Sequence, residues 1–440
     1  MAIRTVDEYK ESLRDGRRVY VMGEKVKDVT THPVLGPTCD TVGGAYELCA
    51  SKDPDVRDLY VAPHPVTGEP ISRFYITPHT KEDLANRSKM IRRSIEILGD
   101  LPFGRDIGTD CLNAAFVVAG KMGKKEYQDN AANFLEYLRK NDLFTCGAVT
   151  DVKGDRSKEP ANQKHPDYYV HVVDKNKEGI IIKGAKAHIT SGPIVNEIVV
   201  IPTRQMRENE SEYAVSFAIP ANTKGITFIC RGGRGAWTEH DFHPDNPIRT
   251  LTEAIIIFDN VFVPWERVFM CGEWQHSMLL AYTFATFHRF TAISYKIPLV
   301  ETAAGCAVAM AKYNGLEKVG HIRNNKLHFA SKYHSFIELI QNIGGGIIGT
   351  APDKKDWDHP DLHGYLEHYL GGAAKFSTEE RMKMIHETMR QTCSHESAFH
   401  EVITVHAEGS MEAQKMMILA ESPLRKYEEM AKRKAGIIPW

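Results

Sequence analysis

His288 is the residue whose type and surroundings point most directly to acid–base chemistry. It lies among three aromatic residues, Phe284, Phe287 and Phe290, and Lys296 follows about two helical turns later. An imidazole changes its charge near neutral pH, so a histidine in a pocket can act as a general base. If the helix is continuous, His288 and Lys296 lie near the same face and can share a pocket. A histidine satisfied within an apolar core is the alternative, and the residues alone leave both interpretations open.

Two strand-like segments, Gly147–Arg156 and Ile182–Gly192, carry the second pattern with chemical meaning. Small residues, threonine hydroxyls and exposed backbone amides at strand ends can line a flat ring with many hydrogen-bonding atoms, and a flavin is such a ring. Thr190 is the leading candidate, because its hydroxyl and amide groups could hydrogen-bond the ring and change where charge resides in its reduced form. The alternative for Thr190 is a strand residue paired across a sheet.

Three further polar residues are candidates for substrate binding. Arg105 lies between Gly104 and Asp106, where a guanidinium could bind a carboxylate or phenolate in bidentate fashion. A surface salt bridge to Asp106 or Asp110 is the alternative. The other two, His400 and Glu401, interrupt an otherwise apolar helical pattern, and a solvated helix face would explain them equally well.

Composition excludes several classes of protein. The 440 residues carry a formal net charge of −2, which argues against nucleic acid as the main partner. No segment approaches the ~20 apolar residues of a membrane span, and we expect a cytoplasmic protein. The eight cysteines form no C-x-x-C pair, and the acidic and histidine residues between Asp356 and His368 are interpreted as a solvated loop. No metal site is therefore predicted.

The hydrophobic pattern changes twice along the chain and predicts three domains. Residues 1–144 are predicted to be helical, with an amphipathic helix over Lys81–Leu98 capped by Thr80. Residues 145–271 contain short β-branched runs, typical of a compact antiparallel barrel or sandwich, and residues 272–440 return to helices. Ser377–Glu380 is a capping-box pattern in this last part. The predicted class is α+β rather than alternating βαβ.

The chain resembles a known flavoprotein family over nearly its whole length. The layout resembles the acyl-CoA dehydrogenase fold. More closely, the chain resembles the group that holds the 4-hydroxyphenylacetate 3-monooxygenases (large component) and the 4-hydroxybutyryl-CoA dehydratases. The segments that carry the resemblance are Arg18–Pro33, Asn141–Leu143, Thr150–Arg156, Gly184–His188, Phe258–Pro264 and Gly409–Ser410.

This resemblance implies a homotetrameric enzyme that binds FAD in its β domain, served in the monooxygenase branch by a separate flavin reductase. A glycine segment near the C-terminus would contact the cofactor from a neighbouring subunit, and Thr190 matches the family threonine near flavin N5. The residues that the resemblance assigns to the cofactor are Thr150, Lys153, Arg156, His188, Thr190, Gly344 and Gly345.

The chain departs from both branches of the family. The dehydratases ligate a [4Fe–4S] cluster with three cysteines and one histidine, whereas this chain has Pro102, Asp106 and Tyr295 at the cysteine positions and keeps only His288. No iron–sulfur cluster is therefore expected. Arg105 matches an arginine of the monooxygenase substrate pocket. The His400–Glu401 pair, followed by Gly409–Ser410, also resembles that branch.

The leading hypothesis is a two-component monooxygenase that uses reduced FAD and O2 to hydroxylate a phenolic substrate. Its specific substrate is open, because Gly147 and Thr109 replace the phenol-binding histidine and tyrosine of that branch. The first alternative is a cluster-free acyl-CoA dehydratase or double-bond isomerase. The second is a non-catalytic flavin-binding subunit, suggested by a chain that is shorter than its relatives between about Asn325 and Phe336.

Overall fold

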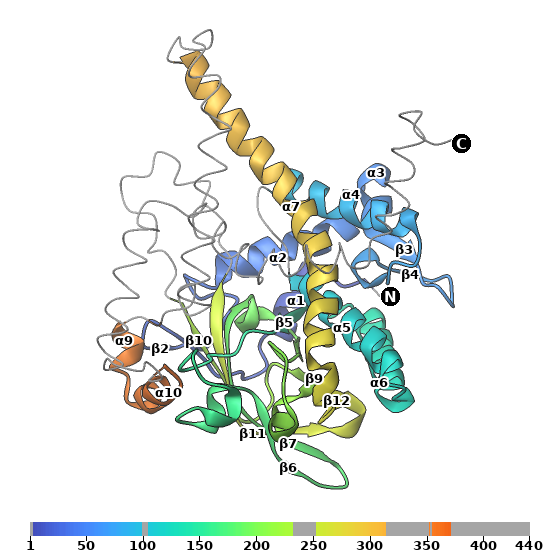
Figure 1. Ribbon diagram of the computed structural model, residues 1–440. Coiled ribbons are helices and arrows are strands. Elements are labelled where there is room, and N and C mark those ends of the chain that lie inside the picture. The colour runs from blue at the N-terminus through green and yellow to red at the C-terminus, as the bar shows by residue number, and fades with distance from the viewer. Residues whose placement is uncertain (1–2, 99–103, 232–251, 314–351, 353, 371–440) are drawn as a thin grey trace, which may run out of the picture. The chain divides into compact units, whose positions relative to one another are not determined.

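The computed structural model describes residues 3–98, 104–231, 252–313, 352 and 354–370 (Figure 1). All of them belong to one compact unit. The helices are α1 (Val6–Ser12), α2 (Gly36–Cys49), α3 (Pro54–Tyr60), α4 (Lys81–Leu98), α5 (Gly104–Lys121), α6 (Lys125–Asn141), α7 (Ser277–Tyr313), α9 (Lys354–Trp357) and α10 (Pro360–Leu370). The strands are β1 (Val19–Val21), β2 (Glu24–Lys25), β3 (Val61–Pro63), β4 (Pro70–Ser72), β5 (Thr145–Ala148), β6 (His171–Lys175), β7 (Gly179–Thr190), β8 (Glu197–Val200), β9 (Val215–Pro220), β10 (Ile226–Cys230), β11 (Glu253–Pro264) and β12 (Val268–Cys271).

The predicted amphipathic helix over Lys81–Leu98 is confirmed as α4, and Thr80 caps it. The backbone N–H of Asp83 donates to the Thr80 hydroxyl over 3.1 Å, which satisfies one of the amides that the first helical turn leaves unpaired. α6 ends at Asn141 because Asp142 adopts a left-handed conformation, with φ +44°, and its N–H bonds back to the carbonyl of Leu138.

The strands form two main sheets rather than the predicted antiparallel barrel. The larger sheet has the order β2-β1-β10-β11-β7-β6, and the smaller has the order β12-β9-β8-β5. The β1–β10 and β5–β8 pairs are parallel. The described strands do not close into a barrel. The hydrophobic pattern predicted the strands themselves, but strand partners and direction depend on contacts distant in the sequence.

Two further expectations need correction. Residues 1–144 are not purely helical, because β1 pairs with β10 and so belongs to the larger sheet. The segment Asp356–His368 is not a solvated loop but lies mainly in α9 and α10, where Asp356 is fully buried. The predicted capping box at Ser377–Glu380 lies outside the described residues.

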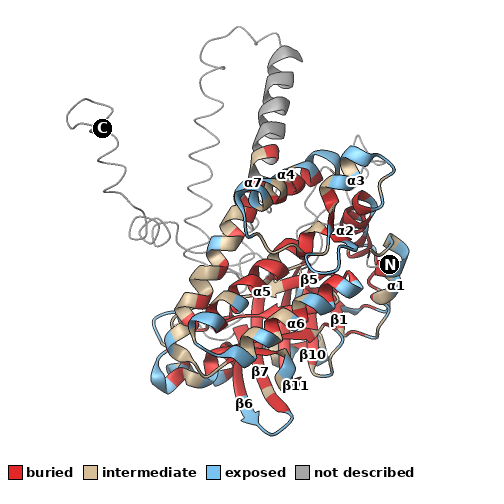
Figure 2. Cartoon of the chain, turned by 90° about the vertical axis from the view of Figure 1, so that its right-hand side faces the viewer, coloured by how far each residue is buried: buried red, intermediate tan, exposed pale blue. Residues whose placement is uncertain are grey.

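α5 is the element that connects the smaller sheet with the other helices. It packs on β5, β8 and β12, and it also contacts α7, which in turn contacts α4. Figure 2 shows the buried residues concentrated along the strands and on the helix faces turned toward them. No helix in the described part of the chain is long and apolar enough to cross a membrane.

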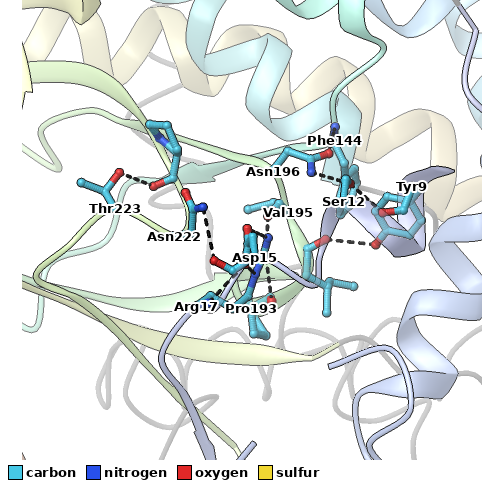
Figure 3. A network of polar contacts seen from close by, with 12 residues as sticks. Tyr9, Ser12, Asp15, Arg17, Phe144, Pro193, Val195, Asn196, Asn222 and Thr223 are labelled. Carbon is cyan, nitrogen blue, oxygen red and sulfur yellow. Dashed lines mark hydrogen bonds and ion pairs between the residues drawn. The ribbon is translucent and has the colours of Figure 1, made fainter. Parts of the chain in front are cut away.

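The N-terminal segment fixes the turn that follows β7 (Figure 3). Arg17 donates from Nη1 to the carbonyl oxygens of Pro193 and Val195, over 2.9 and 2.7 Å. The Tyr9 hydroxyl donates to the carbonyl of Ile194 over 3.0 Å. Because these carbonyls are buried, the bonds restrain the backbone just beyond Thr190.

Candidate active site

The two strand-like segments of the sequence meet along the C-terminal half of β7. β5 ends at Ala148, so most of the segment Gly147–Arg156 is a loop rather than a strand. This loop pairs with β7 through a bridge between Asp151 and Lys186, and the Ala187 N–H donates to the Thr150 carbonyl over 2.8 Å. The structure thus brings the predicted cofactor residues of the loop beside those at the end of β7.

A buried ion pair holds this junction. Lys186 Nζ lies 2.9 Å from Asp151 Oδ1 and donates to the carbonyls of Val149 and Ile201, over 2.7 and 2.9 Å. Lys186 is 1% exposed and Asp151 is 3% exposed. Burial lowers the pKa of Lys186 and raises the pKa of Asp151, while the attraction between them opposes both shifts.

Lys153 and Arg156 add positive charge to the same loop. Lys153 is half-buried and has a φ of +66°, and burial together with the nearby Arg156 lowers its pKa to about 8. Arg156 is exposed. The loop therefore presents cations that could bind an anionic group such as a phosphate or a reduced flavin ring.

At the end of β7, Thr190 lies opposite Glu253 of β11, and its hydroxyl donates to Glu253 Oε1 over 2.8 Å. Burial raises the pKa of Glu253, which is 1% exposed. Glu253 Oε2 and Ser191 Oγ are buried and hydrogen-bond no residue in the described part of the chain. Such unused polar atoms beside a strand end fit a hydrogen-bonding ligand, so the residues present are compatible with FAD.

Glu253 is a residue that the sequence analysis missed. The sequence did contain a signal for it, because Glu253 is an acidic residue at the start of an apolar run, Glu253–Val263. Only the strand register shows that it faces Thr190.

The second group of polar residues lies between α4, α5 and α7. Arg87 of α4 forms ion pairs with Asp106 and Asp110 of α5, with Nη2 3.2 and 2.9 Å from their respective Oδ1 atoms. Thr291 of α7 donates to Asp110 Oδ2 over 2.8 Å, and His288 Nδ1 lies 3.6 Å from the same oxygen. His288 is thus part of a buried cluster of charged residues, not isolated among apolar ones.

His288 also stacks on Phe284, with ring centroids 5.2 Å apart and an angle of 9° between the rings. It is 5% exposed. Lys296 lies on the same helix, α7, as the sequence analysis expected. The partners Arg87, Asp106 and Asp110 were not predicted as site residues, although two acidic residues one turn apart in a small-residue helix were a visible signal.

Arg105 does not form the surface salt bridge to Asp106 or Asp110 that was the alternative to substrate binding. It is fully buried, and Nη1 lies 2.9 Å from Asp142 Oδ1. Its guanidinium lies 3.7 Å from the centre of the Tyr46 ring. The surface salt bridge to Asp106 or Asp110 is therefore wrong, and the role of Arg105 in substrate binding stays a prediction.

Gly147 and Thr109 are the residues that the family resemblance matches to a phenol-binding histidine and tyrosine. A Cβ atom on Gly147 would lie 2.6 Å from Cys111 Sγ and 2.8 Å from Ile107 Cγ2, so α5 and β5 are in direct contact at this glycine. The Thr109 hydroxyl donates to the carbonyls of Arg105 and Asp106 within its own helix. A substrate would therefore have to be held by other groups.

We predict that Gly147→His is destabilising. The new side chain cannot fit between Cys111 and Ile107 without separating α5 from β5, which should lower the free energy of unfolding by ~1–3 kcal/mol. Urea unfolding measures this. A smaller change, Gly147→Ala, serves as a control. Adding Cys111→Ala to it should recover part of the lost free energy of unfolding, because the Cys111 sulfur is the nearest atom to the new Cβ. A Gly147→His variant as stable as the natural chain would contradict the packing described here.

The remaining predicted residues, Gly344, Gly345, His400 and Glu401, lie outside the described part of the chain. Within that part, no group of three or more histidine, cysteine or acidic residues could hold a metal ion.

Comparison with known proteins identifies relatives along the whole chain. Residues 5–270 match the family model "4-hydroxyphenylacetate 3-hydroxylase N terminal", and residues 324–436 match the corresponding C-terminal model. The chain is 30% identical to a 4-hydroxybutyryl-CoA dehydratase/vinylacetyl-CoA-Δ-isomerase from Clostridium aminobutyricum, over 99% of this chain and 100% of the relative.

Two solved structures show the same fold. An oxygen-tolerant archaeal 4-hydroxybutyryl-CoA dehydratase from N. maritimus has a TM-score of 0.73 and 29% identity, covering 100% of this chain and 96% of its own. The oxygenase component of 4-hydroxyphenylacetate 3-monooxygenase, solved with FAD and 4-hydroxyphenylacetate, has a TM-score of 0.65 and 23% identity. It covers 99% of each chain.

Proposed function

The chain belongs to the 4-hydroxyphenylacetate 3-hydroxylase family, and from this premise we propose that it is the oxygenase component of a two-component, FAD-dependent monooxygenase that hydroxylates a phenolic substrate. The single observation that carries the proposal is that the chain has Pro102, Asp106 and Tyr295 where the resemblance places the cysteines of the cluster-binding branch. Reduced FAD, when bound, supplies the electrons that activate O2.

The residues proposed to hold FAD combine hydrogen-bonding groups with positive charge. Thr190 and His188 lie at the end of β7, and Thr150, Lys153 and Arg156 lie on the adjacent loop. Gly344 and Gly345 are proposed to contact the cofactor from the C-terminal part of the chain. The bonds from Arg17 and Tyr9 would restrain the backbone of this site before FAD binds.

On the substrate side, His288 is proposed to remove the proton from the substrate hydroxyl, because an ionised phenol is more electron-rich and easier to hydroxylate. Asp110 lies beside Nδ1 and would stabilise the protonated imidazole. Lys296 and Arg105 are proposed to be catalytic residues together with His288, and Arg105, His400 and Glu401 are proposed to bind the substrate. Phe284, stacked on His288, would help to exclude water.

The proposal also covers the assembly. We propose a homotetramer, a separate flavin reductase as partner and a cytoplasmic location. The proposed domains are a helical domain (1–144), a flavin-binding β domain (145–271) and a helical domain (272–440).

The proposal can be tested with chemically reduced FAD, which removes the need for the reductase. Protein loaded anaerobically with reduced FAD is mixed with ¹⁸O2 and a panel of substituted phenols, and the products are analysed by mass spectrometry. We expect a hydroxylated phenol that carries one labelled oxygen. Formation of hydrogen peroxide alone with every phenol would overturn the monooxygenase proposal, as would a stoichiometric iron–sulfur cluster in anaerobically purified protein.

The second candidate is a cluster-free acyl-CoA dehydratase or isomerase. It is favoured by the full-length identity of 30% to a dehydratase/isomerase. This candidate predicts tight binding of a CoA thioester and exchange of its α-proton with deuterated solvent without O2. If the chain shows neither the binding nor the exchange, this candidate is removed. Turnover of any substrate would remove the non-catalytic alternative.

We predict that Glu253→Leu lowers the reduction potential of bound FAD. The Thr190 hydroxyl donates its proton to Glu253, so the Thr190 oxygen can only accept a hydrogen bond from a ligand. Reduced flavin carries an additional ring N–H that could donate to this oxygen, and the reduced form would therefore be favoured. The preference for reduced flavin is worth about one hydrogen bond, and its loss should lower the reduction potential by roughly 10–30 mV. Equilibrium reduction against a dye of known potential measures the shift.

Two control variants test whether Thr190 transmits this effect. Glu253→Gln keeps an acceptor oxygen and should shift the potential less. In a Thr190→Val background, Glu253→Leu should produce no further shift. An equal shift with and without the Thr190 hydroxyl would contradict the prediction.

A further inference from the structure

Two buried carboxylates share one arginine between α4, α5 and α7. Asp106 and Asp110 lie one helical turn apart on α5, and Arg87 Nη2 contacts both. The exposed fractions of Arg87, Asp106 and Asp110 are 5%, 3% and 1%. One cation cannot neutralise two buried carboxylates, so the pair favours retention of one proton.

The two carboxylates differ in the hydrogen bonds that they accept. Asp110 accepts from Arg87 over 2.9 Å and from Thr291 over 2.8 Å, with His288 Nδ1 3.6 Å away. Asp106 Oδ1, in contrast, accepts no hydrogen bond from any described residue, although Arg87 lies 3.2 Å away. Asp106 therefore has the less well satisfied carboxylate, and it is the member of the pair that gains and loses a proton.

Other charged or titratable groups face Asp106 from each neighbouring helix. They are Arg87 on α4, Asp110 and Arg105 on α5, His288 on α7 and, further away, Tyr60 on α3. Arg105 is already paired with Asp142, and the Tyr60 hydroxyl donates to the Met90 carbonyl. Burial, which Asp110 reinforces, raises the pKa of Asp106 to about 7.

We propose that the buried carboxylate pair of Asp106 and Asp110 receives the proton that His288 removes from the hydroxyl group of the substrate, a role that rests on the function proposed above. In the first step the substrate O–H bond breaks, its electron pair stays on the substrate oxygen, and an N–H bond forms on His288. In the second step that N–H bond breaks and an O–H bond forms on the carboxylate pair, whose Asp110 member lies 3.6 Å from His288 Nδ1 and whose Asp106 member keeps the proton. The imidazole is thereby returned to its neutral form within a buried site, where a lasting additional positive charge is costly.

Two buried atoms without a hydrogen bond from a described residue are compatible with a ligand beside this centre. Arg87 Nη1, like Asp106 Oδ1, is buried and has no hydrogen-bond partner among the described residues. Because buried polar atoms are normally paired, these two atoms could take part in binding a polar ligand.

The first experiment follows the ionisation of Asp106 itself and needs neither substrate nor FAD. Infrared difference spectroscopy of the full chain between pH 5 and 9 should reveal a carboxyl group that titrates near pH 7. The band should be lost in Asp106→Asn and kept in Glu197→Gln, a matched variant that removes another buried carboxylate paired with one arginine. A neutral titration that persists in Asp106→Asn, or is missing from the natural chain, would overturn the proposal.

A second variant makes the result independent of how well Asp106→Asn folds. Arg87→Met removes the cation that stabilises the Asp106 carboxylate. The midpoint of the infrared titration of Asp106 should therefore rise by one pH unit or more. Arg87→Lys retains a positive charge and should shift it less. Equal midpoints in the natural chain and Arg87→Met would count against the proposed centre.

The second experiment uses 4-nitrophenol as the probe, because its ionised form absorbs visible light and its neutral form does not. If Asp106 and the bound phenol compete for one proton, the probe should ionise at a pH about one unit lower in Asp106→Asn than in the natural chain. Glu197→Gln should behave as the natural chain does. Identical ionisation in all three proteins would overturn the proton transfer to Asp106.

The two experiments separate the inference from the proposed function. Failure of 4-nitrophenol to bind the natural chain counts against a phenolic substrate, and the infrared titration then decides alone whether Asp106 exchanges a proton. Binding with unchanged ionisation leaves the monooxygenase proposal standing and removes the role of Asp106.

Discussion

Replacing His288 by glutamine is expected to slow hydroxylation by roughly 10²–10⁴-fold, the usual contribution of a positioned general base. Glutamine retains hydrogen-bonding groups but cannot take up a proton. The buried position of His288, its stacking on Phe284 and the nearby Asp110 carboxylate leave the imidazole well placed to hold a proton transiently. Product formation from reduced FAD, O2 and a phenol measures the loss.

A second readout separates proton removal from damage to the flavin site. In His288→Gln, O2 consumption should continue while hydrogen peroxide replaces the hydroxylated product, because the electrons come from the flavin. The affinity for FAD should not change. His276→Gln is the matched control, since His276 lies on the segment just before α7 and has no proposed role. A His288→Gln rate within a few-fold of the natural chain would show that His288 is not the base.

Replacing Lys186 by methionine is expected to lower the free energy of unfolding by ~3–5 kcal/mol, the usual cost of removing one partner of a buried ion pair. Methionine fills much of the same volume, so the loss would come mainly from Asp151, which stays buried without its cation. The carbonyls of Val149 and Ile201 also lose their donor. Because these contacts hold the loop with Thr150 and Lys153 against β7, FAD should bind more weakly as well.

The loss in Lys186→Met should depend on pH. Burial already raises the pKa of Asp151, and without Lys186 it rises further. The folded variant therefore binds more protons than the unfolded chain from about pH 4 upward, so its stability falls as the pH rises toward neutrality. Urea unfolding at pH 5 should consequently show a smaller difference from the natural chain than unfolding at pH 8.

Two other variants calibrate this result. Lys183→Met removes a partly exposed lysine that lies 3.2 Å from Asp167, and it should cost at most ~1 kcal/mol. The double variant Asp151→Asn/Lys186→Met should recover part of the stability lost in Lys186→Met, because it leaves no buried charge unpaired. If Lys186→Met were as mild as Lys183→Met, the buried pair would not be what fixes this loop.

The local pattern of the sequence was sufficient to predict individual elements. The amphipathic spacing over Lys81–Leu98 coincides with α4, and the apolar run Ala254–Val263 lies within β11. A helix or a strand is defined by residues close in the chain, and its apolar face shows in the spacing of those residues. Segments such as Thr150–Arg156 and Gly184–His188 likewise carried the family resemblance.

Local spacing could not predict which helices and strands pack against one another. An apolar periodicity predicts that a face is buried but not what it packs against, so β1 beside β10 and the two separate sheets were not foreseen. For the same reason the sequence analysis selected His288 and Thr190 but missed Asp110 and Glu253.

Those pairs join residues 178 and 63 positions apart in the chain. Their meeting depends on the packing of α5 against α7 and on the register of β7 with β11. Residue types and local spacing therefore determined the elements, the family and the candidate groups. Only the tertiary structure decided which charges face one another, because burial and pairing, rather than residue type, fix the protonation of a buried acid such as Asp106.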